Sequence, residues 1–315
     1  MNRTRQETAT QTIAPQNNAK KGEPVMNMTR TSKTKSALTV TLSLAAALAW
    51  TSTVSAALIA EDSFDYSVNG LAGNGSAGDG WAGGWTGDGS VTSPGFDYTD
   101  SNSAQLITAG NKATLEGPDS GHARGFRTLA STQSPAVDQP LWIGAIMQRH
   151  DNSPDDNDRA FSLAFLDNND NVLFHFGQNN DDNRWWILSK GDPDLNDDHV
   201  EGYAEGTSTL DKSFLVVRLS TDGNDETLDL FVNPDLDTAP TGSGDITISD
   251  SIPAFLKVRL WAGGGDIGTA AATADFDELR IGTIFGDVAP IPEPASALLL
   301  ALGAVALLKR RPRRG

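Results

Sequence analysis

The chain has 315 residues, a length that fits one large β domain or two smaller domains. It carries 24 Lys and Arg against 41 Asp and Glu, and it contains no Cys. The formal net charge of −17 disfavours a nucleic-acid partner, because an acidic surface repels phosphate, and the lack of Cys excludes disulfides and thiolate metal ligands.

The acidic residues are concentrated in the middle of the chain. Seven Lys and Arg lie before residue 36 and five lie after residue 308, whereas 38 of the 41 acids lie between Ala57 and Ile291. With the 12 basic residues that remain, this stretch has a net charge near −26. A surface of this charge is expected to attract divalent cations.

Two segments precede the acidic stretch. Residues 1–27 are polar without periodicity, and we expect a disordered upstream extension before a true start at Met26 or Met28. Residues 28–56 have a basic lead, an apolar run (Ala37–Trp50) and the small-residue exit Val54-Ser55-Ala56, the three parts of a secretory signal. A buried core helix is the alternative, which the basic lead disfavours. We expect a signal helix, the secretion translocon as a partner, and cleavage between Ala56 and Ala57.

Short apolar runs separated by Gly, Asn and Asp predict β-strands over residues 57–288. Phe161–Phe165 and Val172–Phe176 flank "DNNDN" as one hairpin, and Leu215–Leu219 and Leu228–Val232 flank "TDGNDE" as another. The other predicted strands are Ile59–Phe64, Ala104–Ile107, Leu141–Arg149, Arg184–Leu188, Ala254–Trp261 and Phe276–Gly282. About a dozen strands at this spacing predict one all-β domain, an antiparallel sandwich of two sheets.

Three stretches of this domain carry a family resemblance: "IAEDSFDYSVNGLAGNGSAGDGWAGGWTG", "LVVRLSTDGNDETLDLFVNP" and "FDELRIGT". Their order resembles the concanavalin A/LamG-like jelly-roll domain. The resemblance implies a two-sheet jelly roll over residues 57–288.

The tail, residues 289–315, has three parts in a fixed order. Pro292-Glu293-Pro294 is followed by the apolar run Ala295–Leu308 and by five basic residues. As a helix this run would span roughly 21 Å, less than the roughly 30 Å hydrocarbon core of a bilayer. An ordinary tail anchor is the alternative, but the short span favours a temporary transmembrane helix.

The three parts of the tail resemble the PEP-CTERM sorting signal of exopolysaccharide-producing Gram-negative bacteria. The resemblance implies that an exosortase-type membrane protease recognises Pro292, Glu293 and Pro294 and removes the tail. We therefore expect export, transient anchoring in the inner membrane through Ala295–Leu308, and release to the cell surface or the extracellular matrix.

No catalytic constellation is evident in the sequence. Laminarinase-like hydrolases on a jelly roll carry E-x-D-x-x-E on one strand, whereas the nearest pattern here is Asp275, Asp277 and Glu278, expected at the edge of the last strand. The G-x-G-x-x-G matches Gly73–Gly78 and Gly263–Gly268 do not open a helix and are predicted to be loops. His175 is predicted to play a structural role on the strand face opposite Phe174 and Phe176.

Two further patterns suggest ligands. Asp192, Asp194, Asn196 and Asp198 alternate in "DPDLNDD", an oxygen-rich arrangement that suits a structural calcium ion, although solvated loops explain it as well. Trp185 and Trp186 are adjacent, so on a strand one faces the core and the other faces outward, where it could stack on a sugar, although a packing role explains both residues as well. Trp81 and Trp85 could do the same or could close one end of the sandwich.

Together these patterns and the two resemblances imply an exported, exosortase-processed, non-catalytic surface or matrix protein that binds carbohydrate such as exopolysaccharide. The alternative is a glycan-active hydrolase or lyase on a jelly-roll fold.

Overall fold

The structure is a computed structural model, which describes residues 57–117, 121–150, 159–179, 183–189, 200–264 and 272–292. The expected signal helix and the expected sorting helix lie outside these residues. None of the helices in the described part is long and apolar enough to cross a membrane.

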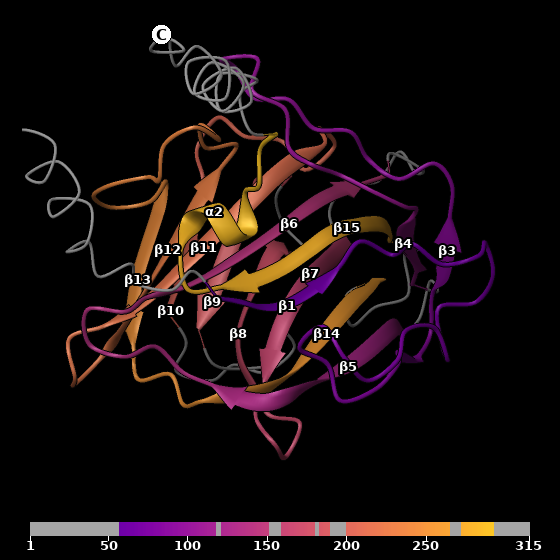
Figure 1. Cartoon of the computed structure of the whole chain (residues 1–315), viewed down its shortest axis with the longest axis horizontal. Coiled ribbons are helices and arrows are strands. Elements are labelled where there is room, and N and C mark those ends of the chain that lie inside the picture. Colours follow the sequence, from indigo (N-terminus) through magenta and orange to yellow (C-terminus); the bar gives the residue numbers. More distant parts are fainter. Residues whose placement is uncertain are drawn as a thin grey trace, which may run out of the picture. The chain divides into compact units, whose positions relative to one another are not determined.

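Fifteen strands of the described chain form two antiparallel sheets (Figure 1). Sheet I contains, in spatial order, β13 (Ile246–Asp250), β12 (Glu226–Val232), β11 (Ser213–Thr221), β6 (Leu141–Arg149), β15 (Thr273–Gly282), β4 (Lys112–Glu116) and β3 (Ser90–Thr92), and β1 (Leu58–Asp62) also pairs with β15. Sheet II contains β10 (Val200–Tyr203), β9 (Trp186–Ser189), β8 (Val172–Gln178), β7 (Arg159–Leu166), β14 (Phe255–Gly264), β5 (His122–Gln133) and β2 (Thr86–Gly87).

The chain alternates between the sheets, because β4, β6 and β15 belong to sheet I whereas β5, β7 and β14 belong to sheet II. The predicted all-β, two-sheet antiparallel sandwich is confirmed, and this alternation is consistent with a jelly roll. The short helix α2 (Phe285–Val288) follows β15.

The predicted strand boundaries are right where apolar residues alternate. β6 spans the predicted Leu141–Arg149, and both predicted hairpins are present. The strand predicted at Ala104–Ile107 is wrong: the N–H of Leu106 donates to Tyr98 O, whereas that of Ile107 donates to Pro290 O. This segment therefore bonds to two different parts of the chain and forms no ladder.

The core between the sheets is rich in stacked aromatic side chains. The rings of Phe165 and Phe174, on β7 and β8, are 4.6 Å apart and nearly parallel, and Phe255 of β14 meets Phe165 edge-on at 5.1 Å. The alternating inward positions of both sheets supply this core.

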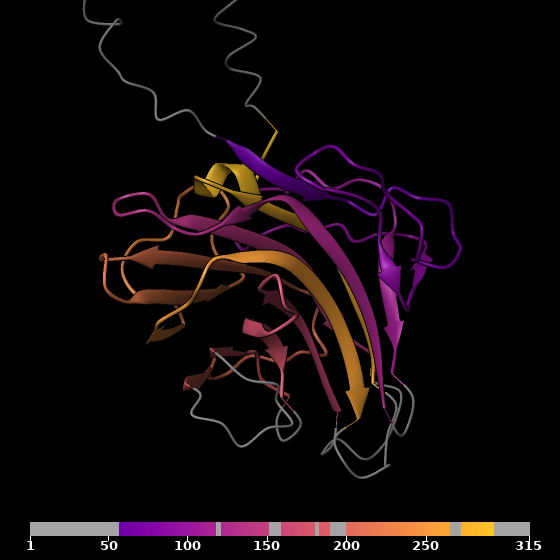
Figure 2. The same cartoon turned by 90° about the horizontal axis from the view of Figure 1, so that it is seen from below.

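A second, smaller core covers the outer face of sheet I. Trp142 of β6 stacks on Phe231 of β12 and meets Phe285 of α2 edge-on at 5.5 Å. Phe96, Tyr98 and Leu106, from the loop between β3 and β4, belong to the same cluster. Helix α2 and the loop between β3 and β4 therefore cover much of the outer face of sheet I (Figure 2).

The Gly-rich segment after β1 closes one end of the sandwich. The buried Asp62 carboxylate accepts hydrogen bonds from Trp85 Nε1 (2.6 Å) and Tyr66 Oη (3.0 Å) and forms an ion pair with Arg127 of β5. The Arg127 guanidinium lies 4.4 Å from the Trp81 ring. Trp81 and Trp85 are both buried, so they pack inside the fold and are not available to stack on a sugar.

Candidate functional site

Trp185 and Trp186 lie on opposite faces of sheet II, as their adjacency predicts. Trp185 is in the core at 0% exposure, with its Nε1 donating to Ser213 Oγ at 3.1 Å. Trp186 is on the outer face, where its Nε1 donates to Glu201 Oε2 at 2.9 Å and its ring meets His175 edge-on at 4.6 Å. His175 also contacts Ser162 Oγ at 3.3 Å, in agreement with its predicted structural role.

The strand register places Trp186 in a row across the outer face of sheet II. Trp186 pairs with Gly177, Gly177 with Ser162, Ser162 with Trp261, and Trp261 with Arg124. Two tryptophans thus flank a floor of small residues, and three strand spacings of about 4.8 Å separate their backbones by roughly 14 Å.

The expectation of an exposed stacking tryptophan is nevertheless wrong. Trp186 has only 2% of its surface exposed, and Trp261 and Ser162 are buried as well. Alternation along a strand predicts the face that a side chain occupies, but its exposure depends on what packs over that face.

The β5 end of this row is more open than its middle. His122 and Arg124 are half-buried, and the His122 ring lies 5.0 Å from that of Trp261. His122 also lines a polar pocket of about 390 Å³, which opens where sheet I and sheet II meet.

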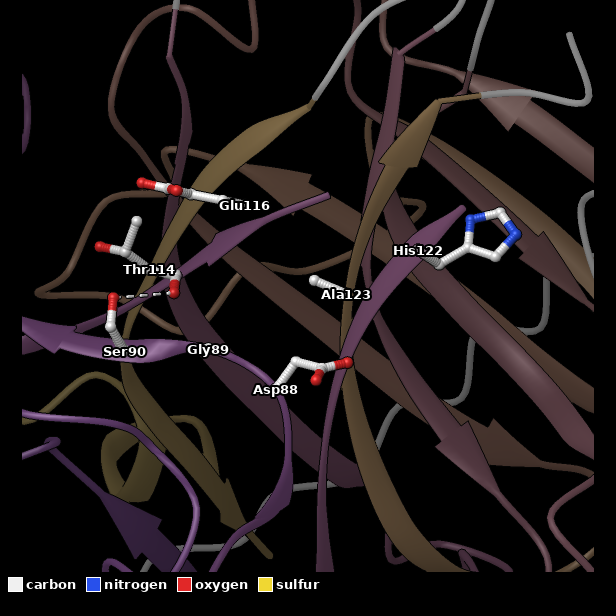
Figure 3. Close-up of a pocket in the computed structure, with 7 residues that line it drawn as sticks. All are labelled: Asp88, Gly89, Ser90, Thr114, Glu116, His122 and Ala123. Carbon is white, nitrogen blue, oxygen red and sulfur yellow. Dashed lines mark hydrogen bonds between the residues drawn. The ribbon is translucent and has the colours of Figure 1, made fainter. Parts of the chain in front are cut away.

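The pocket draws side chains from both sheets (Figure 3). Ser90 of β3 and Thr114 and Glu116 of β4 line it from sheet I, His122 and Ala123 of β5 line it from sheet II, and Asp88 and Gly89 connect β2 with β3. Figure 3 shows Ser90, Thr114 and Glu116 gathered on one side, Asp88 next to β5, and the His122 ring extending from β5 on the far side. Ser90 Oγ donates to Thr114 O at 3.4 Å.

The chemistry of this pocket is that of a hydrogen-bonding site. Two carboxylates, two hydroxyls and an imidazole line a water-accessible hollow, next to the aromatic pair His122 and Trp261. The carboxylates of Asp88 and Glu116 accept, and the hydroxyls both donate and accept. Such a lining suits a ligand with many hydroxyl groups.

Behind the pocket, Asp275 of β15 organises a buried polar cluster. It accepts from Thr114 Oγ1 (2.6 Å), contacts His150 Nε2 (2.7 Å) and pairs with Lys112 Nζ (2.9 Å). Burial opposes ionisation, but the bonds from His150, Thr114 and Lys112 outweigh it and hold the pKa of Asp275 below its usual value. The bond to Asp275 raises the pKa of His150. This cluster fixes Thr114 against the pocket.

Asp275, Asp277 and Glu278 lie inside the last strand, β15, and not at its edge, so that expectation is wrong. β15 lies between β6 and β4 in sheet I, because these distant segments pair on both of its sides. Asp277 accepts from the N–H of Phe96 at 2.7 Å, and Glu278 binds the N–H of Ala109 and the Arg280 guanidinium, each at 2.5 Å. Both acids are buried and fasten the loop before β4 to the last strand.

Burial raises the pKa of both acids, Asp277 and Glu278. Desolvation, with the neighbouring Glu278 charge, raises the pKa of Asp277 to about 8. Desolvation also raises the pKa of Glu278 to about 7, although Arg280 opposes this shift. Since neither carboxyl reaches solvent, the perturbation reflects a structural role.

Several predicted site residues lie outside the described part of the chain. These are the calcium candidates Asp192, Asp194, Asn196 and Asp198, together with Ala56, Glu293 and Pro294. In the part that is described, no group of three or more His, Asp or Glu side chains could hold a metal ion. Ala57 and Pro292 are described, and both are exposed.

No family model matches the sequence, and no curated protein matches it. Among solved structures, the endo-1,3-β-glucanase of Streptomyces sioyaensis is similar at 14% identity and a TM-score of 0.45, over 72% of this chain and 96% of that chain. The endo-β-1,4-glucuronan lyase of Trichoderma reesei is similar at 12% identity and a TM-score of 0.43, over 71% and 97%. The CBM2 module of the evolved Dit protein of Lactobacillus casei BL23 phage J-1 has 9% identity and a TM-score of 0.40, over 73% and 96%.

Trp261 and the pocket were not singled out by the sequence analysis. A signal for Trp261 was present, because Val258 and Leu260 alternate with Arg259 and Trp261 in a predicted strand and so assign Trp261 to the outer face. No local signal joins Ser90, Glu116 and His122, which come from three strands in two sheets.

Proposed function

We propose that the chain is an exported, exosortase-processed, non-catalytic protein of the cell surface or extracellular matrix, with a concanavalin A/LamG-like domain that binds carbohydrate. The polar pocket between β4 and β5 carries this proposal. Its carboxylates and hydroxyls would bind sugar hydroxyls, and the half-buried His122 ring, which packs against the buried Trp261, lines the pocket from β5.

The exposure of both ends of the domain supports the processing part of the proposal. Ala57, the expected first residue after signal cleavage, and Pro292, the first residue of the sorting triplet, are both exposed beside a folded domain. A protease can reach a peptide bond only where the backbone is accessible.

Polysaccharide pull-down tests the binding role. The full chain is expected to be retained by at least one of laminarin, alginate and the exopolysaccharide of its host, and Glu116→Gln and His122→Ala are expected to weaken retention. Asp211→Asn, an exposed carboxylate before β11, is the matched control and should bind as the wild type does. If the wild type is retained by none of these polymers, the binding role is wrong.

Mass spectrometry of the protein from its native source tests the processing. We expect an N-terminus at Ala57 and loss of the chain beyond the Pro292-Glu293-Pro294 triplet. Recovery from the cytosol with both ends intact would contradict export.

A glycan hydrolase or lyase remains the second candidate, because Asp88 and Glu116 line one pocket and glycosidases use a pair of carboxylates. Release of reducing ends or unsaturated uronates from these polysaccharides, abolished by Asp88→Asn or Glu116→Gln, would replace the binding role by this one.

A further inference from the structure

Both ends of the described domain lie on one side of the sandwich. The N–H of Ala57 donates to Thr283 Oγ1 at 3.1 Å, and the N–H of Thr283 donates back to Ala57 O at 3.2 Å. Pro290, just before the tail, accepts from the N–H of Ile107 at 2.8 Å. Figure 2 shows the start of β1 and the stretch after α2 on the same side.

This side also exposes apolar side chains. Leu58, Ile107 and Ile284 have 46%, 45% and 36% of their surfaces exposed, and they are three of the six large apolar residues exposed in the described part of the chain. Beside Ile284 a groove of about 490 Å³ is lined by Leu236, Phe285, Ala289, Pro290 and Ile291, among others. We call the three exposed residues and this groove the terminal patch.

We propose that the terminal patch rests on the lipid bilayer while the tail anchors the protein. This inference depends on the proposed transient anchoring. No other feature of the described domain is as closely tethered to the tail, because the groove is lined by Pro290 and Ile291 themselves.

The length of the connecting chain sets the distance to the membrane. Only three peptide steps separate Pro292 from Ala295, where the apolar run begins, so a fully extended chain spans about 10 Å between them. The headgroup region on each side of a bilayer is about 5–8 Å thick. Once the apolar run is inserted, the terminal patch is therefore held against the headgroup region, from which exposed Leu and Ile side chains can reach the boundary with the acyl chains.

Labelling of single introduced cysteines tests whether the terminal patch faces the bilayer. Since the chain has no native Cys, the fluorophore attaches only at the chosen position. Ile284→Cys and Ile107→Cys, in the full chain, would carry a polarity-sensitive fluorophore. The matched control is Val200→Cys, an apolar residue on β10 of sheet II that is exposed to a similar extent, 41%. Each protein would be mixed with phosphatidylcholine–phosphatidylglycerol vesicles that contain a headgroup quencher.

We expect all three proteins to float with the vesicles. The labels at residues 284 and 107 should shift to the blue and be quenched, whereas the label at residue 200 should keep its emission in buffer. Flotation with an unchanged label at residue 284, or equal quenching of all three labels, would overturn the inference and leave anchoring intact. Failure to float would refute the anchoring itself.

Two further measurements show whether the blue shift requires the apolar side chains and the lipid. Ile107→Glu/Ile284→Glu should keep the melting temperature of the wild type, because both side chains are already exposed. A fourth label, at Leu58→Cys, should shift to the blue on vesicles by itself and lose this shift when both Glu substitutions are present. A change of the residue 284 label on increasing protein concentration without vesicles would assign the patch to a second copy of the chain and overturn the lipid assignment.

Discussion

At the scale of single residues, the buried acids of β15 make the stability of the fold depend on pH. Asp277, with a pKa raised from 3.8 to about 8, binds its proton more tightly in the folded chain than in the unfolded chain. Glu278, with a pKa raised from 4.5 to about 7, acts in the same direction, and so does His150, whose pKa is also raised. The stability that protonation provides is therefore lost as pH rises towards 8.

We predict that the melting temperature of the wild type falls between pH 5 and about 8 and levels off above it. Asp277→Asn cannot titrate, so its melting temperature should change less over this range, whatever its absolute stability. Asp211→Asn, at an exposed site, should follow the wild-type slope. Thermal unfolding followed by circular dichroism measures the melting temperature of the three proteins at each pH. If the melting temperatures of the wild type and Asp277→Asn fall equally with pH, Asp277 is not the group responsible. Asp275, whose pKa is lowered, affects stability only at more acidic pH.

At the scale of elements, the Gly-rich segment depends on a close approach to β1. Gly80 and Gly73 have the same φ of +86°, so replacing either by Ala carries the same backbone penalty, about 1–2 kcal/mol. A Cβ at Gly80 would lie 1.8 Å from Ile59 O, whereas a Cβ at Gly73 would have no neighbour within 4 Å.

Gly80→Ala should therefore lower the free energy of unfolding by about 1–3 kcal/mol more than Gly73→Ala, because β1 or the segment around Trp81 must move. Urea denaturation of the two variants measures this difference directly. Equal losses would mean that the contact of this segment with β1 does not contribute to stability.

The elements also show where sequence reasoning succeeds and fails. β6, β7 and β8 were predicted because their inward positions are consistently apolar. β5 was missed because its inward residues are Ala123, Gly125, Arg127 and Leu129, which show no apolar alternation. Arg127 can be buried only because Asp62, 65 residues earlier, neutralises it. A contact at that separation leaves no periodic signal.

The candidate site depends on the same kind of long-range contact. Adjacency correctly assigned Trp185 and Trp186 to opposite faces, but the burial of Trp186 follows from packing around His175 and Glu201. The pocket combines β3 and β4 with β5 across the junction of the two sheets, and no spacing in the sequence encodes that junction.

At the scale of the whole molecule, the basic groups on the outer face of sheet I are committed to internal ion pairs. Lys112 pairs with Asp275, Arg218 with Asp229, and Arg280 with Glu278. With only 12 basic residues against 38 acids between Ala57 and Ile291, the acids cannot be paired one to one with basic residues. Repulsion among them should be relieved by salt, and a cation that binds a specific site should stabilise the fold further.

A comparison of calcium and sodium salts separates general screening from cation binding at a specific site. We predict that CaCl₂ raises the melting temperature of the full chain more than NaCl at equal ionic strength, because a bound ion stabilises by about 2.7 kcal/mol at a hundredfold excess over its dissociation constant. Asp194→Asn/Asp198→Asn, in the predicted calcium segment, should abolish the extra rise and the heat of binding in isothermal titration. Asp155→Asn/Asp156→Asn, in the separate acidic stretch "DNSPDDND" (Asp151–Asp158), should retain both. Equal effects of the two salts on the wild type would show that screening alone acts, and that the alternating acids at residues 192–198 bind no ion.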